Sequence, residues 1–223
     1  MPASDSATTK RVPLLLWIIV FFQVFIGIAM VIRRTLIISG VIASVNPLPG
    51  PPIDGEFSRH PLMTLLHILP GILFMILGPF QFMKTLRARH IRFHRWSGRI
   101  FIGAAYIIGV SALTMPFVMI PIGGLNEAAA SILFAIFFLI SISLSLKHIL
   151  NKNQALHREW MLRAFAIGLA VATVRPIVGF FFAFSGLPSQ VFFGTAFWIG
   201  FTMHLITAEV WINYTRPRLV TNW

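Results

Sequence analysis

Cysteine is absent from the 223-residue chain. Its absence excludes disulfide bonds, zinc–thiolate sites and catalysis by a thiol. It does not define the compartment, because many proteins in every compartment lack this residue.

Charged residues are also scarce. They make up 11% of the chain and hydrophobic residues 57%, whereas about 25% of a typical soluble domain is charged. A soluble domain of this length could not bury so much apolar surface in one core. The composition therefore indicates a protein whose solvent is the lipid bilayer.

Acidic residues are few relative to basic ones. Six Asp and Glu face 18 Lys and Arg, for a net charge of +12. In a soluble protein this excess would suggest nucleic-acid binding. Here most basic residues stand in short segments between apolar runs, so we interpret them as topology signals and contacts to anionic lipid. We expect membrane lipids as partners, with anionic headgroups at the cytoplasmic face, and no nucleic acid.

The apolar runs are unbroken and about twenty residues long, which is the length of a membrane-spanning helix. Strands of a membrane barrel would instead alternate apolar and polar residues. The sequence therefore predicts an all-α, polytopic transmembrane bundle of about six spans. The expected spans are residues 12–34, 61–83, 100–121, 128–146, 160–184 and 191–214.

The remaining segments complete the expected organisation. Residues 1–11 and 216–223 are predicted to be cytoplasmic tails, residues 35–60 an outer loop, and residues 61–215 a five-helix bundle. The composition does not decide whether residues 35–46 extend the first helix. Three prolines inside the spans predict kinks that neighbouring helices can accommodate; they are Pro70, Pro116 and Pro176.

The distribution of Lys and Arg predicts the orientation. With both termini in the cytoplasm, most basic residues fall on the inner side, as the positive-inside rule requires. The pair Arg33–Arg34 is the discordant signal, because it follows the first span on the outer side. We therefore expect a multi-pass membrane protein with both termini in the cytoplasm.

A weak internal repeat has an offset of 63 residues. Lys84 and His94–Arg95 correspond to Lys147 and His157–Arg158 at this offset. Each copy joins an inward helix, a basic loop and a returning helix that opens with His-Arg. Such copies would be parallel two-helix repeats, related by an axis along the membrane normal.

Three segments together resemble a known family. They are H-x₂-P-G-x₆-G-P-F-Q-F at residues 67–82, H-R-W-S-G-R at residues 94–99, and H-R-E-W-M-L-R at residues 157–163. The chain resembles the bacterial predicted-membrane-protein family catalogued as domain of unknown function 2306, over roughly residues 60–215. The resemblance implies a multi-pass protein of the bacterial plasma (inner) membrane and no particular activity.

The first candidate site lies in the outer half of the bundle. Arg175 stands about 22 Å up the fifth span from the cytoplasmic side, near the expected depth of His67. An arginine at membrane depth is costly and suggests function. One interpretation is an anion or headgroup site that uses Arg175, with His67 as a donor or proton carrier. The alternative is an arginine that binds carbonyls freed by a proline kink.

The second candidate site lies at the cytoplasmic end. His94 and His157 occupy repeat-equivalent positions, and we hypothesise that they form one shared site. The charged or orienting residues expected around them are Arg95, Arg158, Gln81 and Glu209. Two imidazoles and the Glu209 carboxylate would suffice for a divalent metal with an open position. The alternative is that both His-Arg pairs anchor the helix ends to lipid phosphates.

Three classes of function remain open from the sequence. The first is a protein that binds a lipid or quinone headgroup, or a non-catalytic membrane subunit. The second is a redox protein with haem b or quinone, and the third is a metal-dependent membrane enzyme. No P-loop, HExxH, GxSxG or dinucleotide fingerprint occurs. The sequence therefore does not establish a cofactor, an enzymatic activity, an oligomer or a membrane-complex partner.

Overall fold

Six long helices dominate the computed structural model, which describes residues 12–43 and 54–216. Each is long and apolar enough to cross a membrane. The six are α1 (Leu14–Ile38), α3 (Pro61–Phe82), α5 (Ile91–Val118), α6 (Gly124–Leu150), α7 (Gln154–Phe184) and α8 (Ser189–Thr215). The chain is thus an all-α, multi-pass membrane protein, as the composition predicts.

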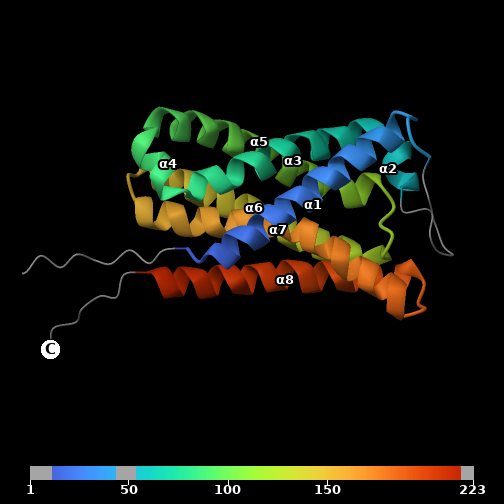
Figure 1. The fold of residues 1–223 in the computed structure, drawn as a ribbon. Helices are drawn as coiled ribbons and strands as arrows, with labels where there is room; N and C mark the ends of the chain where they lie inside the picture. The colour runs from blue at the N-terminus through green and yellow to red at the C-terminus, as the bar shows by residue number, and fades with distance from the viewer. Residues whose placement is uncertain (1–11, 44–53, 217–223) are drawn as a thin grey trace, which may run out of the picture.

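Two short helices mark the two ends of the bundle. The helix α2 (Gly55–Arg59) lies at one end, and α4 (Lys84–Arg89) lies at the other. We call these the α2 end and the α4 end. The start of α1 and the finish of α8 both lie at the α4 end, as Figure 1 shows. An even number of spans requires this arrangement.

The helices extend beyond the predicted spans. Helix α1 continues to Ile38, so residues 35–38 belong to the first helix and not to the loop, whereas residues 44–53 lie outside the described part. Helix α5 begins at Ile91, nine residues before the predicted start. Hydropathy locates only the apolar part of a helix, and Lys and Arg are good helix formers that continue it past the bilayer.

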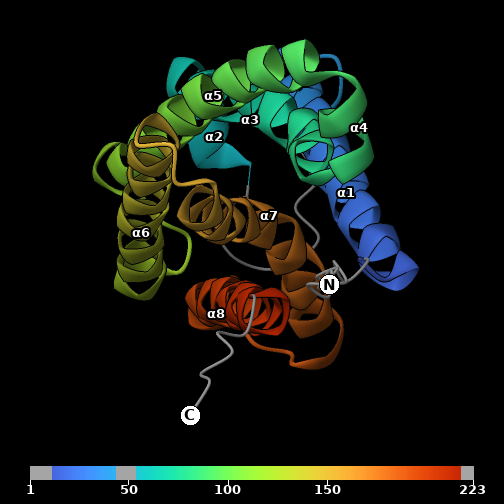
Figure 2. The same cartoon turned by 90° about the vertical axis from the view of Figure 1, so that its left-hand side faces the viewer.

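Helix α7 lies at the centre of the bundle. Figure 2 shows it between α6, α8 and α1, with α3 and α5 on the opposite side from α8. Alanines among its buried residues allow this close packing. They include Ala164, Ala170 and Ala172. Because α7 is surrounded by other helices, its side chains face the interior in several directions. This explains how Arg175 can line an internal cavity.

Helices α3 and α7 cross through two matched glycine–phenylalanine contacts. A Cβ atom at Gly78 of α3 would overlap the ring of Phe165 on α7. Conversely, a Cβ atom at Gly168 of α7 would overlap the ring of Phe74 on α3. Each glycine thus provides the hollow that the aromatic ring of the other helix fills. Phe74 and Gly168 of this crossing also line the apolar, deeper wall of the cavity described below.

Two ion pairs join α7 to α8 at the α4 end. The guanidinium of Arg163 donates to both oxygens of Glu209, at 2.5 and 2.9 Å. Arg216 donates to both oxygens of Glu159, at 2.9 and 2.7 Å. Helix α7 contributes one acid and one base to this double clamp. The other acid lies on α8, and the other base is the residue that follows α8. The hydrogen bonds of Arg216 to Glu159 also raise the pKa of Arg216.

Helix α1 is attached by a polar contact deep in the bundle. The amide of Gln23 donates to Thr173 Oγ1 of α7 at 2.7 Å and lies 3.0 Å from His204 Nε2 of α8. Thr173 Oγ1 and His204 Nε2 are 2.7 Å apart. In lipid these groups have no water to bind, so their mutual hydrogen bonds hold α1 in register with α7 and α8.

Candidate functional site

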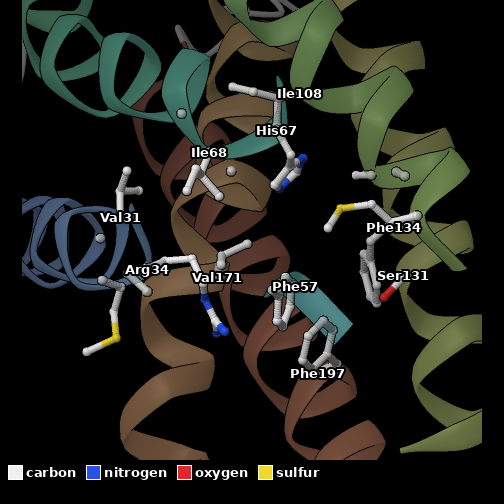
Figure 3. A pocket seen from close by; sticks show the side chains of 18 of the residues that line it. Val31, Arg34, Phe57, His67, Ile68, Ile108, Ser131, Phe134, Val171 and Phe197 are labelled. Atoms are coloured by element: carbon white, nitrogen blue, oxygen red, sulfur yellow. The ribbon is translucent and has the colours of Figure 1, made fainter. Parts of the chain in front are cut away.

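A cavity of about 260 Å³ opens within the α2 half of the bundle. All six long helices contribute residues to its lining, and α2 adds Glu56 and Phe57. Figure 3 shows several of these side chains facing a common space, among them Arg34, Phe57 and His67.

The cavity is polar at one end and apolar at the other. Its charged or titratable wall residues lie towards the α2 end, and they are Arg33, Arg34, Glu56, His67, Glu127 and Arg175. Its deeper wall is aromatic and aliphatic, formed by Phe74, Phe134, Phe138, Ile167 and Phe201. Along α6, about 16 Å of helix rise separates Glu127 from Phe138. The cavity therefore has a charged end near α2 and an apolar end nearer the middle of the bundle.

The arginine pair of α1 forms one side of the polar end. Arg33 donates to both oxygens of Asp54, at 3.0 and 2.7 Å, and Arg34 forms an ion pair with the same carboxylate. The Arg34 guanidinium also lies 3.9 Å from the centre of the Phe57 ring. Asp54 immediately precedes α2, so these contacts fasten α2 to the end of α1.

Helix α2 is fastened on its other side by Glu56. The backbone N–H of Ile120, in the α5–α6 connection, donates to Glu56 Oε2 at 3.1 Å. Arg59 donates to Glu56 Oε1 at 2.6 Å. These bonds, that to Ile120 first, hold the pKa of Glu56 below its usual value. Thus α2 covers the polar end of the cavity through Asp54 on one side and Glu56 on the other.

His67 presents one ring nitrogen to Ser111 and the rest of its ring to the cavity. Nδ1 lies 2.9 Å from Ser111 Oγ, and this hydroxyl donates to the carbonyl of Ile107 at 2.7 Å. Since the hydroxyl proton is committed, we assign the Nδ1 proton to His67 as donor. Nε2 then remains as the ring's acceptor. It can receive a hydrogen bond or, when protonated, add a positive charge to the site.

Arg175 and Glu127 line the cavity without an ion-pair partner among the described residues. Four of the five described acidic residues form ion pairs with arginine, and Glu127 is the fifth. Its Oε2 accepts a hydrogen bond from the backbone of Gly123 at 2.7 Å. Within residues 12–43 and 54–216, the Arg175 guanidinium has no hydrogen-bond or ion-pair partner. Both side chains line the cavity.

Each of these two charges lies within electrostatic range of the other. They nevertheless form no ion pair among the described residues, although both side chains line the cavity. An arginine at this depth is costly unless something compensates its charge. The alternative interpretation, an Arg175 bound to carbonyls freed by the neighbouring proline, finds no such hydrogen bond in the described part of the chain.

The structure brings the predicted residues His67 and Arg175 to one cavity. The histidine pair at the α4 end is also brought within electrostatic range, His94 on α5 and His157 on α7. The Nδ1 atoms of the two rings differ in their hydrogen bonding, however. His157 Nδ1 lies 2.8 Å from Ser145 Oγ, whereas His94 Nδ1 is buried with no hydrogen-bond partner among the described residues.

The other residues expected around the two histidines lie elsewhere. Gln81 donates to Ser97 Oγ at 2.7 Å and does not orient an imidazole. Arg158 donates to Thr215 Oγ1 at 3.0 Å, and Arg95 is exposed. Arg87 of α4, which the sequence did not single out, acts electrostatically on both histidines.

The predicted metal ligands His94, His157 and Glu209 do not form a ligand set. The Glu209 carboxylate is occupied by Arg163. The part of the chain that the structure describes contains no group of three His, Asp or Glu residues that could hold a metal ion.

Sequence reasoning missed three contributors to the cavity: Arg34, Glu127 and α2. A signal existed for the first two. The Arg33–Arg34 pair conflicted with the charge rule, and Glu127 is a lone acid at the start of an apolar run. No local pattern indicated that Asp54 would join α2 to α1, because that pairing depends on how the chain returns over the bundle.

Comparison with known proteins supports the resemblance found in the sequence. Residues 64–212 match the model of the family described as "Predicted membrane protein (DUF2306)". The chain belongs to this family. No curated protein and no solved structure matches. The matched region contains His67, Glu127 and Arg175, whereas Arg34 and Phe57 precede it. The family region thus supplies most of the cavity, and α1 and α2 add its outer wall and cover.

Proposed function

We propose that the protein binds a lipid-like amphiphile in this cavity, with the anionic headgroup at Arg175 and the chain against the deeper aromatic wall. The observation that carries the proposal is the Arg175 guanidinium, enclosed in the bundle without a partner among the described residues. Guanidinium groups bind carboxylate and phosphate oxygens through paired hydrogen bonds. An anionic headgroup would therefore supply the paired hydrogen bonds that the described residues do not provide.

The nearby residues support an anionic headgroup over a quinone. Arg34 adds a second guanidinium to the same polar end, and His67 adds a group that can donate or accept. A quinone offers only neutral carbonyl oxygens, which would leave the charge of Arg175 uncompensated in a membrane interior. Diacylglycerol and phosphatidylglycerol have the same apolar chains, but only phosphatidylglycerol has an anionic headgroup. Comparing them therefore tests whether binding requires the negative charge in addition to the chains.

Binding is tested with delipidated, purified protein in detergent, titrated with phosphatidylglycerol or diacylglycerol and observed by native mass spectrometry. We expect phosphatidylglycerol to bind and diacylglycerol to bind at least about tenfold more weakly, because a charge-assisted hydrogen bond contributes roughly 1.5–3 kcal/mol. Arg175→Gln should remove this difference. The matched control is Arg92→Gln, which removes an exposed charge at the α4 end. Equal binding of both lipids by the unaltered protein would contradict the proposal.

The orientation of the bundle is a further part of the proposal. Basic residues concentrate at the α4 end, on α4 and on the adjoining starts of α5 and α7. The positive-inside rule then places this end and both termini in the cytoplasm, and the cavity in the outer half of the plasma membrane. In intact cells, a cysteine introduced at the exposed Ser58 should react with an impermeant maleimide. A cysteine at the exposed Arg89 should react only after permeabilisation, and the reverse pattern would invert the orientation.

A further inference from the structure

Glu127 requires an explanation that an anionic headgroup alone does not provide. It lies on the first turn of α6 and shares the cavity with Arg175. A purely anionic ligand bound to Arg175 would face a carboxylate within electrostatic range, and like charges repel strongly where water is excluded. A site built only for anions would not benefit from an acid at this position.

The two unpaired charges instead form a separated positive and negative pole. Arg175 and Glu127 line the same space without touching, since no ion pair joins them in the described part of the chain. The other described carboxylates show that this protein readily pairs acids with arginine when the two can meet. A ligand that carries both charges, spaced by a few bonds, would satisfy each pole with its opposite.

We infer that the cavity selects a zwitterionic aminophospholipid headgroup, with its phosphate at Arg175 and its primary ammonium at Glu127. The inference rests on the proposed function and narrows the class of headgroup. A primary ammonium donates three hydrogen bonds, and the Glu127 carboxylate can accept one of them beside the backbone N–H groups of Gly123 and Ile122. Arg34 also lines this polar end, but its charge is paired with Asp54, so Arg175 is the cation assigned to the phosphate.

The geometry of the cavity also orients such a lipid. Glu127 begins α6 at the α2 end, and the deeper lining of the same helix is formed by Phe134 and Phe138. The ammonium would therefore lie nearest α2, the phosphate beside α7, and the acyl chains against the aromatic floor. This order matches the order of groups along an ethanolamine lipid.

The test compares phosphatidylethanolamine with phosphatidylglycerol of identical acyl chains, each titrated into delipidated protein and quantified by native mass spectrometry. We expect the unaltered protein to bind phosphatidylethanolamine about tenfold more tightly. Glu127→Gln should remove this preference and leave phosphatidylglycerol binding intact or stronger. The amide oxygen of glutamine can still accept from Gly123, so the start of α6 retains its hydrogen bond.

Two further variants separate the possible failures. Arg175→Gln should weaken the binding of both lipids, whereas Glu209→Gln, at the opposite end, should preserve the preference. If phosphatidylglycerol binds in an Arg175-dependent way but phosphatidylethanolamine is not preferred, the inference is wrong and the proposed function stands. A preference that survives in Glu127→Gln would also overturn the inference. If neither lipid depends on Arg175, the proposed function itself fails.

Discussion

The two ends of the bundle use charge in different ways. At the α4 end, Glu159 and Glu209 are each bound by an arginine across the α7–α8 contact. At the α2 end, Arg175 and Glu127 share a cavity but form no ion pair within the described residues. Paired charges fix the relation of two helices, whereas separated charges in an enclosed space are available to a ligand. The comparison therefore separates charges that hold two helices together from charges that line a cavity.

The α2 end contains both kinds of charge, which sharpens the distinction. Asp54 and Glu56 are paired, and both hold α2 in place over the cavity. The unpaired groups lie beneath this cover, on α6 and α7. Asp54 and Glu56 therefore hold the cover in place, whereas Arg175 and Glu127 face the interior of the cavity.

Breaking the clamp at the α4 end should have the largest effect on stability. Arg163→Gln would leave Glu209 beside α7 without its cation, and we expect a loss of roughly 1–3 kcal/mol in the free energy of unfolding, because the pair is only partly exposed. Thermal unfolding in detergent measures this loss, and lipid binding should be retained. Arg92→Gln is the control and should unfold at the unaltered temperature. A stable Arg163→Gln protein would contradict a structural role.

Neutralising the charges of the cavity should have a smaller effect of the opposite sign. The double variant Arg175→Gln/Glu127→Gln removes two charges from a low-dielectric space where neither has an ion-pair partner among residues 12–43 and 54–216. We expect unchanged or slightly higher thermal stability of the delipidated protein, by up to about 1 kcal/mol, because no charge then needs solvation. The same variant should show no stabilisation by added lipid. A marked loss of stability would mean that the two charges support each other structurally.

The smallest expected effect concerns pH and the cover helix α2. The pKa of Glu56 is lowered in the folded protein, chiefly by the N–H of Ile120, so the carboxylate stabilises α2 at neutral pH. This contribution is present above the unfolded pKa and is lost as the pH falls through the folded pKa. Hydrogen exchange of α2, corrected for intrinsic rates, should rise a few-fold in acid. Glu56→Gln should exchange faster at pH 7 and lose the pH dependence.

The sequence predicted the fold because the signal is local. Each of the six apolar runs of helix length indicates by itself that the segment lies in lipid. The structure contains a long helix at each run. The ends of the helices were less predictable, as α5 illustrates by its start at Ile91. Basic residues there belong to the helix although hydropathy assigns them to a loop. Helix ends depend on propensity and capping, which apolar composition does not measure.

The candidate site was predictable only in part. The depth of Arg175 along its helix, and that of His67, followed from counting residues, and both line one cavity. The expected metal ligands were wrong as a set because depth alone does not specify the direction of a side chain. Glu209 lies at the right end of the bundle but contacts Arg163 instead of an imidazole.

What the sequence determined by itself is the class of solvent, the number of spans and the rarity of charge within them. These are properties of single segments, each set by the transfer of its own side chains into lipid. The tertiary structure alone decided which charges meet. Asp54 reaches Arg33 and Arg34 across the return of the chain, and Arg175 and Glu127 line the same cavity without joining in an ion pair. Such distances depend on the packing of all six helices, which no single segment encodes.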